Sequence, residues 1–195
     1  MLNHTEPLNI ILGSQSPRRR ELMAGLDISF SCVTIDADES YPAELKAGDI
    51  PMYISRAKAR AYVSELQDND LLITSDTIVW LNDEMLGKPQ DEAEAKAMLA
   101  RLSGQTHEVY TAVCFADKNG ELETWVDCTK VTFNTLSEED IDYYVTKYRP
   151  LDKAGAYGVQ EWIGYVGVTR MEGSYFNVMG FPICHVYERL KKYLR

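Results

Sequence analysis

Residues 8–22 read Leu-Asn-Ile-Ile-Leu-Gly-Ser-Gln-Ser-Pro-Arg-Arg-Arg-Glu-Leu, an apolar run followed by a Gly-Ser turn and by the start signals of a helix. Ser16 is a preferred residue type at a helix N-cap, and Pro17 suits the first helical position. The order of these signals predicts a strand over 8–12 that leads directly into a helix over 17–24.

Three consecutive arginines, Arg18, Arg19 and Arg20, follow the predicted cap directly. A helix N-terminus already carries a positive partial charge, so each exposed cation there costs about 0.3–1 kcal/mol. The arrangement becomes favourable when an anion fills the site. Free backbone N–H groups, the hydroxyls of Ser14 and Ser16, and guanidinium groups can all bind phosphate oxygens. The turn therefore predicts a phosphate-binding site.

Composition limits the class of protein. The chain has 195 residues, of which 45% are hydrophobic and 26% charged, as expected for a soluble globular protein with a core. The sequence shows neither an apolar run long enough to span a membrane nor a signal peptide, so we expect a cytoplasmic protein. The net charge of -10 argues against nucleic acid and anionic membranes as partners. The basic turn is therefore expected to bind a small polyanion.

Neither the cysteines nor the histidines have the spacing of a metal site. Buried, reduced thiols and structural imidazoles are therefore expected at these positions: Cys32, Cys114, Cys128, Cys184, His4, His107 and His185.

Strand and helix signals alternate along the rest of the chain. Further strands are predicted over 28–34, 71–81, 106–116, 122–133, 164–170 and 174–179. Further helices are predicted over 51–66 and 91–102, from Ser137 to before Pro150, and after Pro182, where Ile183, Val186, Leu190 and Leu194 face inward. Crossover helices together with an Asn-Gly hairpin at 117–120 predict an α/β fold with a mixed twisted sheet flanked by helices. We expect a single domain, residues 1–195, with two lobes around a cleft.

Several polar residues interrupt these patterns. Asp76 lies in the otherwise apolar run 71–81, where a buried carboxylate is costly unless it is paired. It is either a turn or bulge residue bonded to nearby backbone, or a metal ligand or general base at a strand end. Lys58 and Lys88, each taken alone, resemble surface lysines. Glu39 lies in an acidic loop and is either solvated or a metal ligand.

A glycine-rich segment spans residues 152–160, and its glycines permit close approach of the backbone to a ligand. Lys153, Tyr157 and Gln160 offer a charge, an aromatic face and an amide that can pair with a base edge. The alternative is a plain surface loop. Walker A, dinucleotide-binding and hydrolase-elbow motifs are absent from the sequence. These residues together favour a metal-assisted nucleotide hydrolase.

The sequence resembles the Maf family of nucleoside triphosphate pyrophosphatases from about residue 8 to residue 190. The resemblance is carried by these segments: Ser14–Leu22, Arg56–Ala59, Ser75–Thr77, Leu86–Pro89, Leu102–Gly104 and Asp152–Gln160. It implies a Maf or inosine triphosphatase-like fold. It also implies cleavage of a nucleoside triphosphate between its α- and β-phosphates, to a nucleoside monophosphate and pyrophosphate.

The same resemblance implies roles for the polar residues. Asp76 matches the proton acceptor that activates water, and Glu39 matches a further acid of the site. Both are then candidate ligands of a divalent cation, Mg²⁺ or Mn²⁺. Lys58 and Lys88 match lysines that hold phosphates, and with the two acids they form the expected catalytic set.

Arg19, Thr77 and Gln160 match positions that mark the subfamily acting on dTTP and UTP. The full set expected to bind substrate is Ser14, Ser16, Arg18, Arg19, Thr77, Lys153 and Gln160. The expected partner is therefore a nucleoside triphosphate, without nucleic acid or membrane, and the resemblance suggests a homodimer. An alternative is a nucleotide-binding regulator of septum formation or cell division with little turnover. A single-stranded nucleic acid binder is disfavoured by the net charge.

Overall fold

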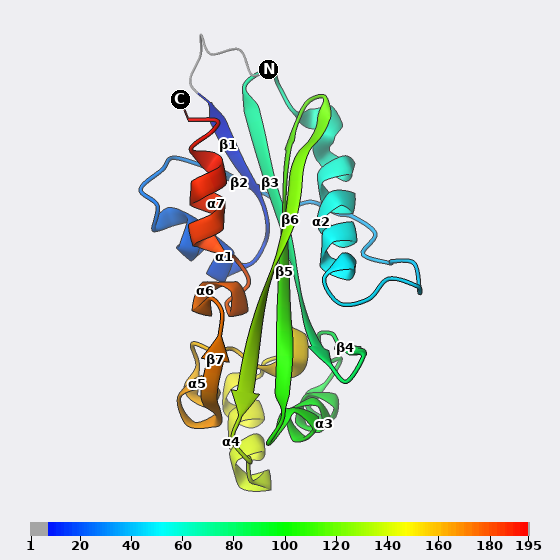
Figure 1. Cartoon of the computed structure of the whole chain (residues 1–195), viewed down its shortest axis with the longest axis vertical. Coiled ribbons are helices and arrows are strands. Elements are labelled where there is room, and N and C mark those ends of the chain that lie inside the picture. The colour runs from blue at the N-terminus through cyan, green and yellow to red at the C-terminus, as the bar shows by residue number, and fades with distance from the viewer. Residues whose placement is uncertain (1–7, 195) are drawn as a thin grey trace. The chain divides into compact units, whose positions relative to one another are not determined.

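The computed structural model describes residues 8–194 (Figure 1). These residues form two compact units. The first unit contains residues 8–76, 111–127 and 180–194, and the second contains residues 77–110 and 128–179. The chain passes between the units three times inside strands, namely β3 (Asp70–Leu81), β5 (Thr106–Asp117) and β6 (Gly120–Phe133), and once in the turn at Met179 and Gly180. Because these three crossings fall inside strands, no linker composition marks them in the sequence. The single domain and the cleft stay predictions.

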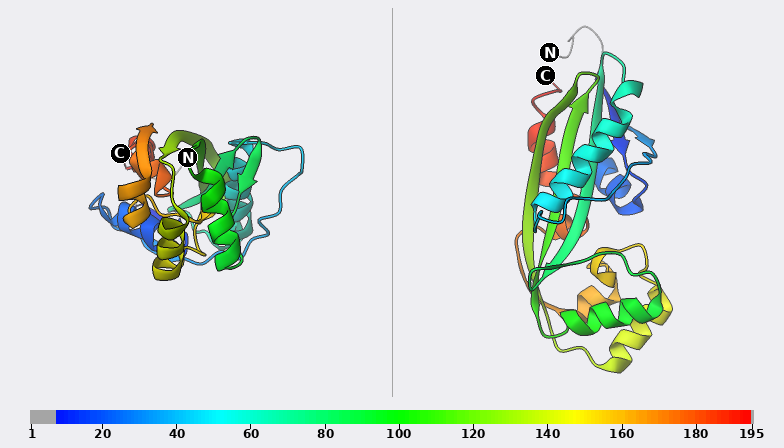
Figure 2. Two further views of the ribbon diagram at one scale, coloured as in Figure 1. Left: turned by 90° about the horizontal axis from the view of Figure 1, so that it is seen from below. Right: turned by 90° about the vertical axis from the view of Figure 1, so that its right-hand side faces the viewer.

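In the first unit, β1 (Asn9–Gly13) lies between two strands and pairs in parallel with β2 (Ser31–Val33) and with the first half of β3. Ile10 and Leu12 pack with α7 (Ile183–Leu190), whereas Ile11 packs with Ala59 of α2 (Asp49–Tyr62). Figure 2 (right) shows α2 and α7 on opposite sides of these strands. Both faces of β1 are therefore buried, which explains its unbroken apolar sequence.

The predicted strand–turn–helix at the N-terminal end of the described chain is confirmed. β1 ends at Gly13, and α1 (Pro17–Ala24) begins with Ser16 as N-cap, whose side chain accepts from the Arg19 N–H at 3.5 Å. Pro17 occupies the first helical position, as predicted. The turn residues thus direct the chain from the carboxyl end of β1 into α1.

In the second unit, antiparallel pairing predominates. β4 (Glu84–Leu86) pairs with the second half of β3 across the turn Asn82-Asp83, and β7 (Val168–Glu172) pairs with the second half of β6. Both turn residues have positive φ, the conformation of a tight hairpin turn. The parallel pairs of the first unit and the antiparallel pairs of the second confirm the mixed sheet.

Helices α3 (Glu92–Leu102) and α4 (Glu138–Tyr148) form the main helical layer of the second unit, with the short α5 (Trp162–Gly167) and α6 (Tyr175–Val178). The Asp91 side chain caps α3 by accepting from the Glu94 N–H at 2.8 Å. Ser137 and Asp140 form a reciprocal capping box at the start of α4. Single-turn 3₁₀ segments lie at Val63–Glu65 and Ala154–Ala156.

Four expectations about local structure are wrong. Residues 174–179 form α6 because Ser174 caps a helical turn, and in 164–170 the strand begins only at Val168, after α5. Leu194 is exposed because α7 ends at Leu190. Of the cysteines only Cys114 is buried, since the other three lie on exposed positions of strands and helix: Cys32, Cys128 and Cys184.

Within residues 8–194, no helix is long and apolar enough to cross a membrane. The cytoplasmic location and the homodimer stay predictions, and His4 lies outside the described residues.

Candidate active site

The turn between β1 and α1 is held in shape by its own polar groups. The Ser16 N–H donates to Ser14 Oγ at 3.2 Å, and the Arg20 guanidinium donates from Nε and Nη2 to the Ser14 carbonyl at 3.2 and 3.1 Å. Arg20 therefore stabilises the turn, a role that its place in the arginine run does not reveal. At the start of α1, Pro17 has no N–H, and the Arg20 N–H donates to the Ser16 carbonyl at 3.2 Å.

Arg19 is held by hydrogen bonds to Gly180 and to the part of β3 that belongs to the first unit. Its Nε donates to the Gly180 carbonyl at 2.7 Å and its Nη1 donates to the Ser75 carbonyl at 2.9 Å. Burial lowers the pKa of the Arg19 guanidinium, while the carboxylate of Asp76 raises it. Arg18 and Glu39 act on the same pKa through their charges, lowering and raising it respectively. These four side chains therefore share one electrostatic environment.

Lys58 joins the two predicted catalytic acids. Its Nζ lies 2.8 Å from Asp76 Oδ1 and 2.9 Å from Glu39 Oε1. The side chains of Lys58 and Asp76 are each 13% exposed, whereas that of Glu39 is 52% exposed. Asp76 is thus paired with a lysine in the middle of a continuous strand, so it lies neither in a turn nor at a strand end.

Packing of α2 on the sheet brings Lys58 to Asp76. The buried Thr74 hydroxyl donates to the Ser55 carbonyl at 2.7 Å, which ties β3 to α2 one turn before Lys58. Ala59, the next residue along α2, is buried against Ile11 and Leu72. The apolar contacts therefore set the position of the charged group.

Two carboxylates of the first unit are candidate ligands of a divalent cation. Within residues 8–194, no group of three His, Cys, Asp or Glu side chains could hold a metal ion. Glu39 and Asp76 supply two carboxylates at one place, because both contact Lys58 Nζ. Mg²⁺ is commonly bound by one or two carboxylates together with substrate phosphates. The two acids are therefore suited to such a shared cation.

In the second unit, the glycine-rich segment is buried, so the surface-loop alternative is wrong. Lys153 is 8% exposed, and its Nζ lies 2.7 Å from Asp152 Oδ1 and 3.2 Å from Glu161 Oε1. The Gly155 N–H donates to the Gly87 carbonyl at 3.0 Å. This bond brings the segment beside the loop that carries Lys88, whose side chain is exposed.

Gln160 and Thr77 also belong to the second unit. Gln160 Oε1 is buried, and among the described residues it has no hydrogen-bond partner. Thr77 follows Asp76 directly in β3, and its side chain is half-buried. The structure thus groups Ser14, Ser16, Arg18, Arg19, Glu39, Lys58 and Asp76 in the first unit, and Thr77, Lys88, Lys153 and Gln160 in the second.

His107 and Tyr157 form a buried polar pair in the second unit. His107 Nε2 lies 2.7 Å from the Tyr157 hydroxyl, and both rings make edge-to-face contacts with Phe133. Burial lowers the pKa of His107 to about 4, so the imidazole is neutral at pH 7. The environment agrees with the structural role expected for His107.

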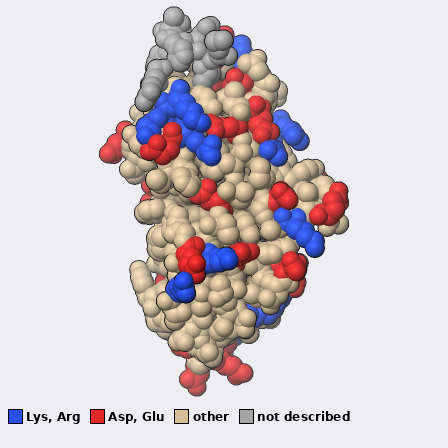
Figure 3. Space-filling view, viewed as in Figure 1, with Lys and Arg blue, Asp and Glu red and all other residues tan. Residues whose placement is uncertain are grey.

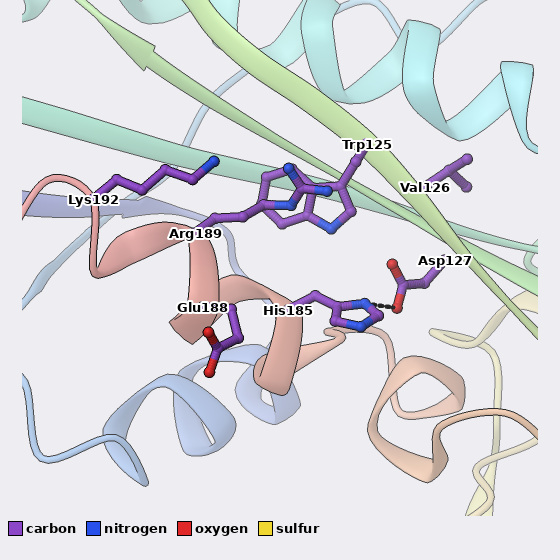
Figure 4. Close-up of a pocket in the computed structure, with 7 residues that line it drawn as sticks. All are labelled: Trp125, Val126, Asp127, His185, Glu188, Arg189 and Lys192. Carbon is purple, nitrogen blue, oxygen red and sulfur yellow. Dashed lines mark hydrogen bonds and ion pairs between the residues drawn. The ribbon is translucent and has the colours of Figure 1, made fainter.

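A separate cavity of about 540 Å³ lies in the first unit (Figure 4). Its polar side chains bind one another: His185 Nδ1 lies 2.6 Å from Asp127 Oδ2, and the Arg189 guanidinium lies 4.3 Å from the centre of the Trp125 ring. None of the predicted site residues lines it. On the face shown in Figure 3, small basic groups adjoin acidic side chains, as expected for a protein of net negative charge.

Comparison with known proteins first gives the class of fold. The chain resembles the crystal structure of a nucleoside-triphosphatase / dITP/XTP pyrophosphatase from Mycobacterium abscessus, with a TM-score of 0.50 and 15% sequence identity. The match covers 96% of this chain and 99% of that one. At this identity the likeness concerns the fold alone, and it supports the predicted inosine triphosphatase-like α/β architecture.

The sequence then gives the family. The model of Maf-like proteins matches residues 9–193, and the chain belongs to this family. It is 52% identical over 193 residues to a protein of Bacteroides thetaiotaomicron named dTTP/UTP pyrophosphatase, a match that covers 98% of this chain and 100% of that protein. A protein of Phocaeicola vulgatus with the same name is 50% identical over 193 residues, with the same coverage.

Proposed function

We propose that this protein hydrolyses nucleoside triphosphates, chiefly dTTP and UTP, to the nucleoside monophosphate and pyrophosphate. The observation that carries the proposal is Asp76 at the Lys58-bridged acidic pair, in the same unit as the anion-binding turn. The substrate class is supported by relatives that are about half identical over nearly the whole chain and are named dTTP/UTP pyrophosphatases.

In this proposal the triphosphate binds to the cationic groups and to the turn after β1. The hydroxyls of Ser14 and Ser16 donate to phosphate oxygens, and Arg18 adds a positive charge. Lys58 and Lys88 neutralise further phosphate charge. Fixed cations of this kind stabilise the charge on the transferring phosphoryl group, the usual source of catalysis in phosphoryl transfer.

Asp76 is the proposed general base. Its carboxylate accepts a proton from the attacking water as the water oxygen bonds to phosphorus and the bond to the bridging oxygen between the α- and β-phosphates breaks. Lys58 holds the carboxylate in place through the 2.8 Å contact to Oδ1. Glu39 and Asp76 are the proposed ligands of Mg²⁺ or Mn²⁺, which when bound supplies further charge neutralisation to the phosphates.

Gln160 is the proposed reader of the base. Uracil and thymine carry an N3–H donor between two carbonyl acceptors, and an amide side chain has both an acceptor and donors. The Gln160 Oε1 atom, which lacks a partner among residues 8–194, is a suitable acceptor for N3–H. Cytosine has no hydrogen on N3. We therefore expect CTP to be a poorer substrate than UTP, with Arg19 and Thr77 as the other specificity positions.

The test is a nucleotide panel. The full chain is incubated with dTTP, UTP, CTP, GTP and ATP in the presence of Mg²⁺, Mn²⁺ or EDTA, and monophosphate and pyrophosphate are measured. We expect dTTP and UTP to be cleaved fastest, in equal amounts of the two products, and EDTA to abolish cleavage. Binding of dTTP without release of pyrophosphate would instead support the alternative of a nucleotide-binding regulator.

A further inference from the structure

Gln160 lies in a tight turn of the second unit. The Glu161 N–H donates to the Gly158 carbonyl at 3.0 Å, which closes a four-residue turn with Val159 and Gln160 at its centre. The orientation of the Gln160 amide therefore depends on what holds the two ends of this turn.

One hydroxyl group holds both ends. The Gly158 N–H donates to the Tyr144 hydroxyl at 3.0 Å, and the same hydroxyl donates to Glu161 Oε2. A phenol has a single proton to donate, so the bond to Glu161 uses its whole donor capacity. Burial, with the hydrogen bond and the charge of Glu161, raises the pKa of Tyr144, so the phenol keeps the proton for this bond at neutral pH.

Tyr144 is a rigid anchor because its helix is well packed. Its side chain is fully buried on α4, next to the buried Val145, and its ring stacks on that of Tyr148 with the centroids 5.1 Å apart. The capping box between Ser137 and Asp140 fixes the start of the same helix. The hydroxyl is thus presented to the turn from a fixed point.

Close packing leaves the turn little freedom around this anchor. A Cβ atom added at Gly158 would lie 2.8 Å from Glu161 Cδ and 3.1 Å from Lys153 Cε. Lys153 also binds Glu161 Oε1 at 3.2 Å, so the Glu161 carboxylate receives Tyr144 on one oxygen and Lys153 on the other. The network connects α4, the turn and the lysine of the glycine-rich segment.

We propose that Tyr144 is a positioning residue for base recognition: its hydroxyl fixes the Gly158–Glu161 turn and thereby the orientation of the Gln160 amide. This inference rests on the proposed function, since it concerns how the same site selects pyrimidine triphosphates. Lys153 acts with Tyr144 by holding Glu161. Removal of the hydroxyl leaves the buried Gly158 N–H without its acceptor and releases both ends of the turn.

The test compares Tyr144→Phe with the wild type on UTP and CTP. Two lost hydrogen bonds predict a KM for UTP about 10-fold higher and a ratio of kcat/KM for UTP over CTP about 10-fold lower. We expect kcat for UTP to stay within about 3-fold, because the hydroxyl does not take part in the proton transfer at Asp76. Gln160→Ala gives the size of the change when the base contact itself is lost.

Tyr148→Phe is the matched control, because it removes a hydroxyl one turn further along α4 and keeps the ring stack. We expect its kinetics to equal those of the wild type. If Tyr144→Phe does not fold, Glu161→Ala removes the other partner of the hydroxyl, and it should lower the same ratio. In the double variant the two effects should be less than additive, since both act through one hydroxyl.

The outcomes separate this inference from the proposed function. A wild-type protein that releases no pyrophosphate from UTP or dTTP overturns the proposed function, and this inference with it. An active wild type with an unchanged UTP-over-CTP ratio in Tyr144→Phe, while Gln160→Ala lowers that ratio, overturns the inference alone. The inference is also overturned if Tyr144→Phe folds and its kcat for UTP falls while its UTP-over-CTP ratio of kcat/KM stays unchanged.

Discussion

Each unit of this protein contains a lysine held between two carboxylates, and the two triads differ in what surrounds them. In the first unit Lys58 binds Glu39 and Asp76, and in the second Lys153 binds Asp152 and Glu161. The exposures are alike, since each lysine is nearly buried and contacts one acid that is more than half exposed. The charges alone therefore do not distinguish the two groups.

The difference lies in the elements that the triads connect. Glu39 and Asp76 come from a loop and a strand, are 37 residues apart in the sequence, and both act on the charge of Arg19 at the start of α1. Asp152 and Glu161 flank one short segment, and Glu161 is bonded to Tyr144 of a packed helix. We therefore expect the Lys58 triad to take part in hydrolysis and the Lys153 triad to hold a backbone segment in place. The following predictions test that distinction.

The largest effect should come from exchanging one aspartate of each triad for asparagine. Asp76→Asn removes the proposed general base, whose contribution is typically about 10²–10⁴-fold in rate. We expect turnover of dTTP to fall by about 10³-fold at unchanged thermal stability, measured as pyrophosphate release and Tm. In the second triad, Asp152→Asn keeps an oxygen for Lys153 and should change turnover by less than about 3-fold.

Equal losses of turnover in Asp76→Asn and Asp152→Asn would remove the distinction between the two triads. Near wild-type pyrophosphate release from Asp76→Asn would contradict the role of Asp76 as base.

A smaller effect is expected on the free energy of unfolding when the pH is lowered, through His107 of the second unit. A histidine side chain has an ordinary pKa of 6.5, and burial lowers the pKa of His107 to about 4 in the folded protein because it disfavours the charged form. Between these values the unfolded state binds more protons, so the free energy of unfolding falls as the pH is lowered. His107 alone should account for a loss of roughly 3 kcal/mol between pH 7 and pH 4.

Urea unfolding at pH 7, 6, 5 and 4 measures this loss. His107→Gln keeps a hydrogen-bonding side chain for Tyr157 but does not titrate, so its unfolding free energy should fall less steeply with acid. Parallel pH profiles for the wild type and the variant would show that His107 does not contribute.

The smallest effect is expected on stability, when one glycine of each unit is replaced by alanine. Gly155 has φ +66°, and a Cβ there would lie 2.9 Å from Val79 Cγ2, so Gly155→Ala should cost about 1–3 kcal/mol. Gly25 has φ -66° and its nearest neighbour would be the Leu22 carbonyl at 3.4 Å, so Gly25→Ala should change stability by less than about 1 kcal/mol. Midpoints of urea unfolding measure both, and equal midpoints would contradict the strain assigned to Gly155.

Features set by neighbours in the sequence could be predicted. The caps at Ser16, Asp91 and Ser137 each bind a backbone N–H three residues ahead, so a short window contains both partners. The strand that contains Asp76 and the hairpin at 117–120 were also accessible, because long apolar periodicity and Asn-Gly are strong local signals.

Features set by tertiary packing could not be predicted in the same way. Lys58 alone resembles a surface lysine, and its contact with Asp76 arises only because α2 packs on the sheet. Tyr144 is spaced with Ile141 and Val145 as part of an apolar helix face, so the sequence marks it as a core residue. Its hydroxyl meets Gly158 and Glu161 only in the folded chain.

The crossings inside β3, β5 and β6 have a consequence for dissecting the protein. The first unit is built from three separate segments, and the second lies between them in the sequence. No single contiguous fragment therefore contains either unit complete without part of the other, and every cut at a boundary within these strands severs a strand. We therefore expect neither unit to be obtained by simple truncation of the chain.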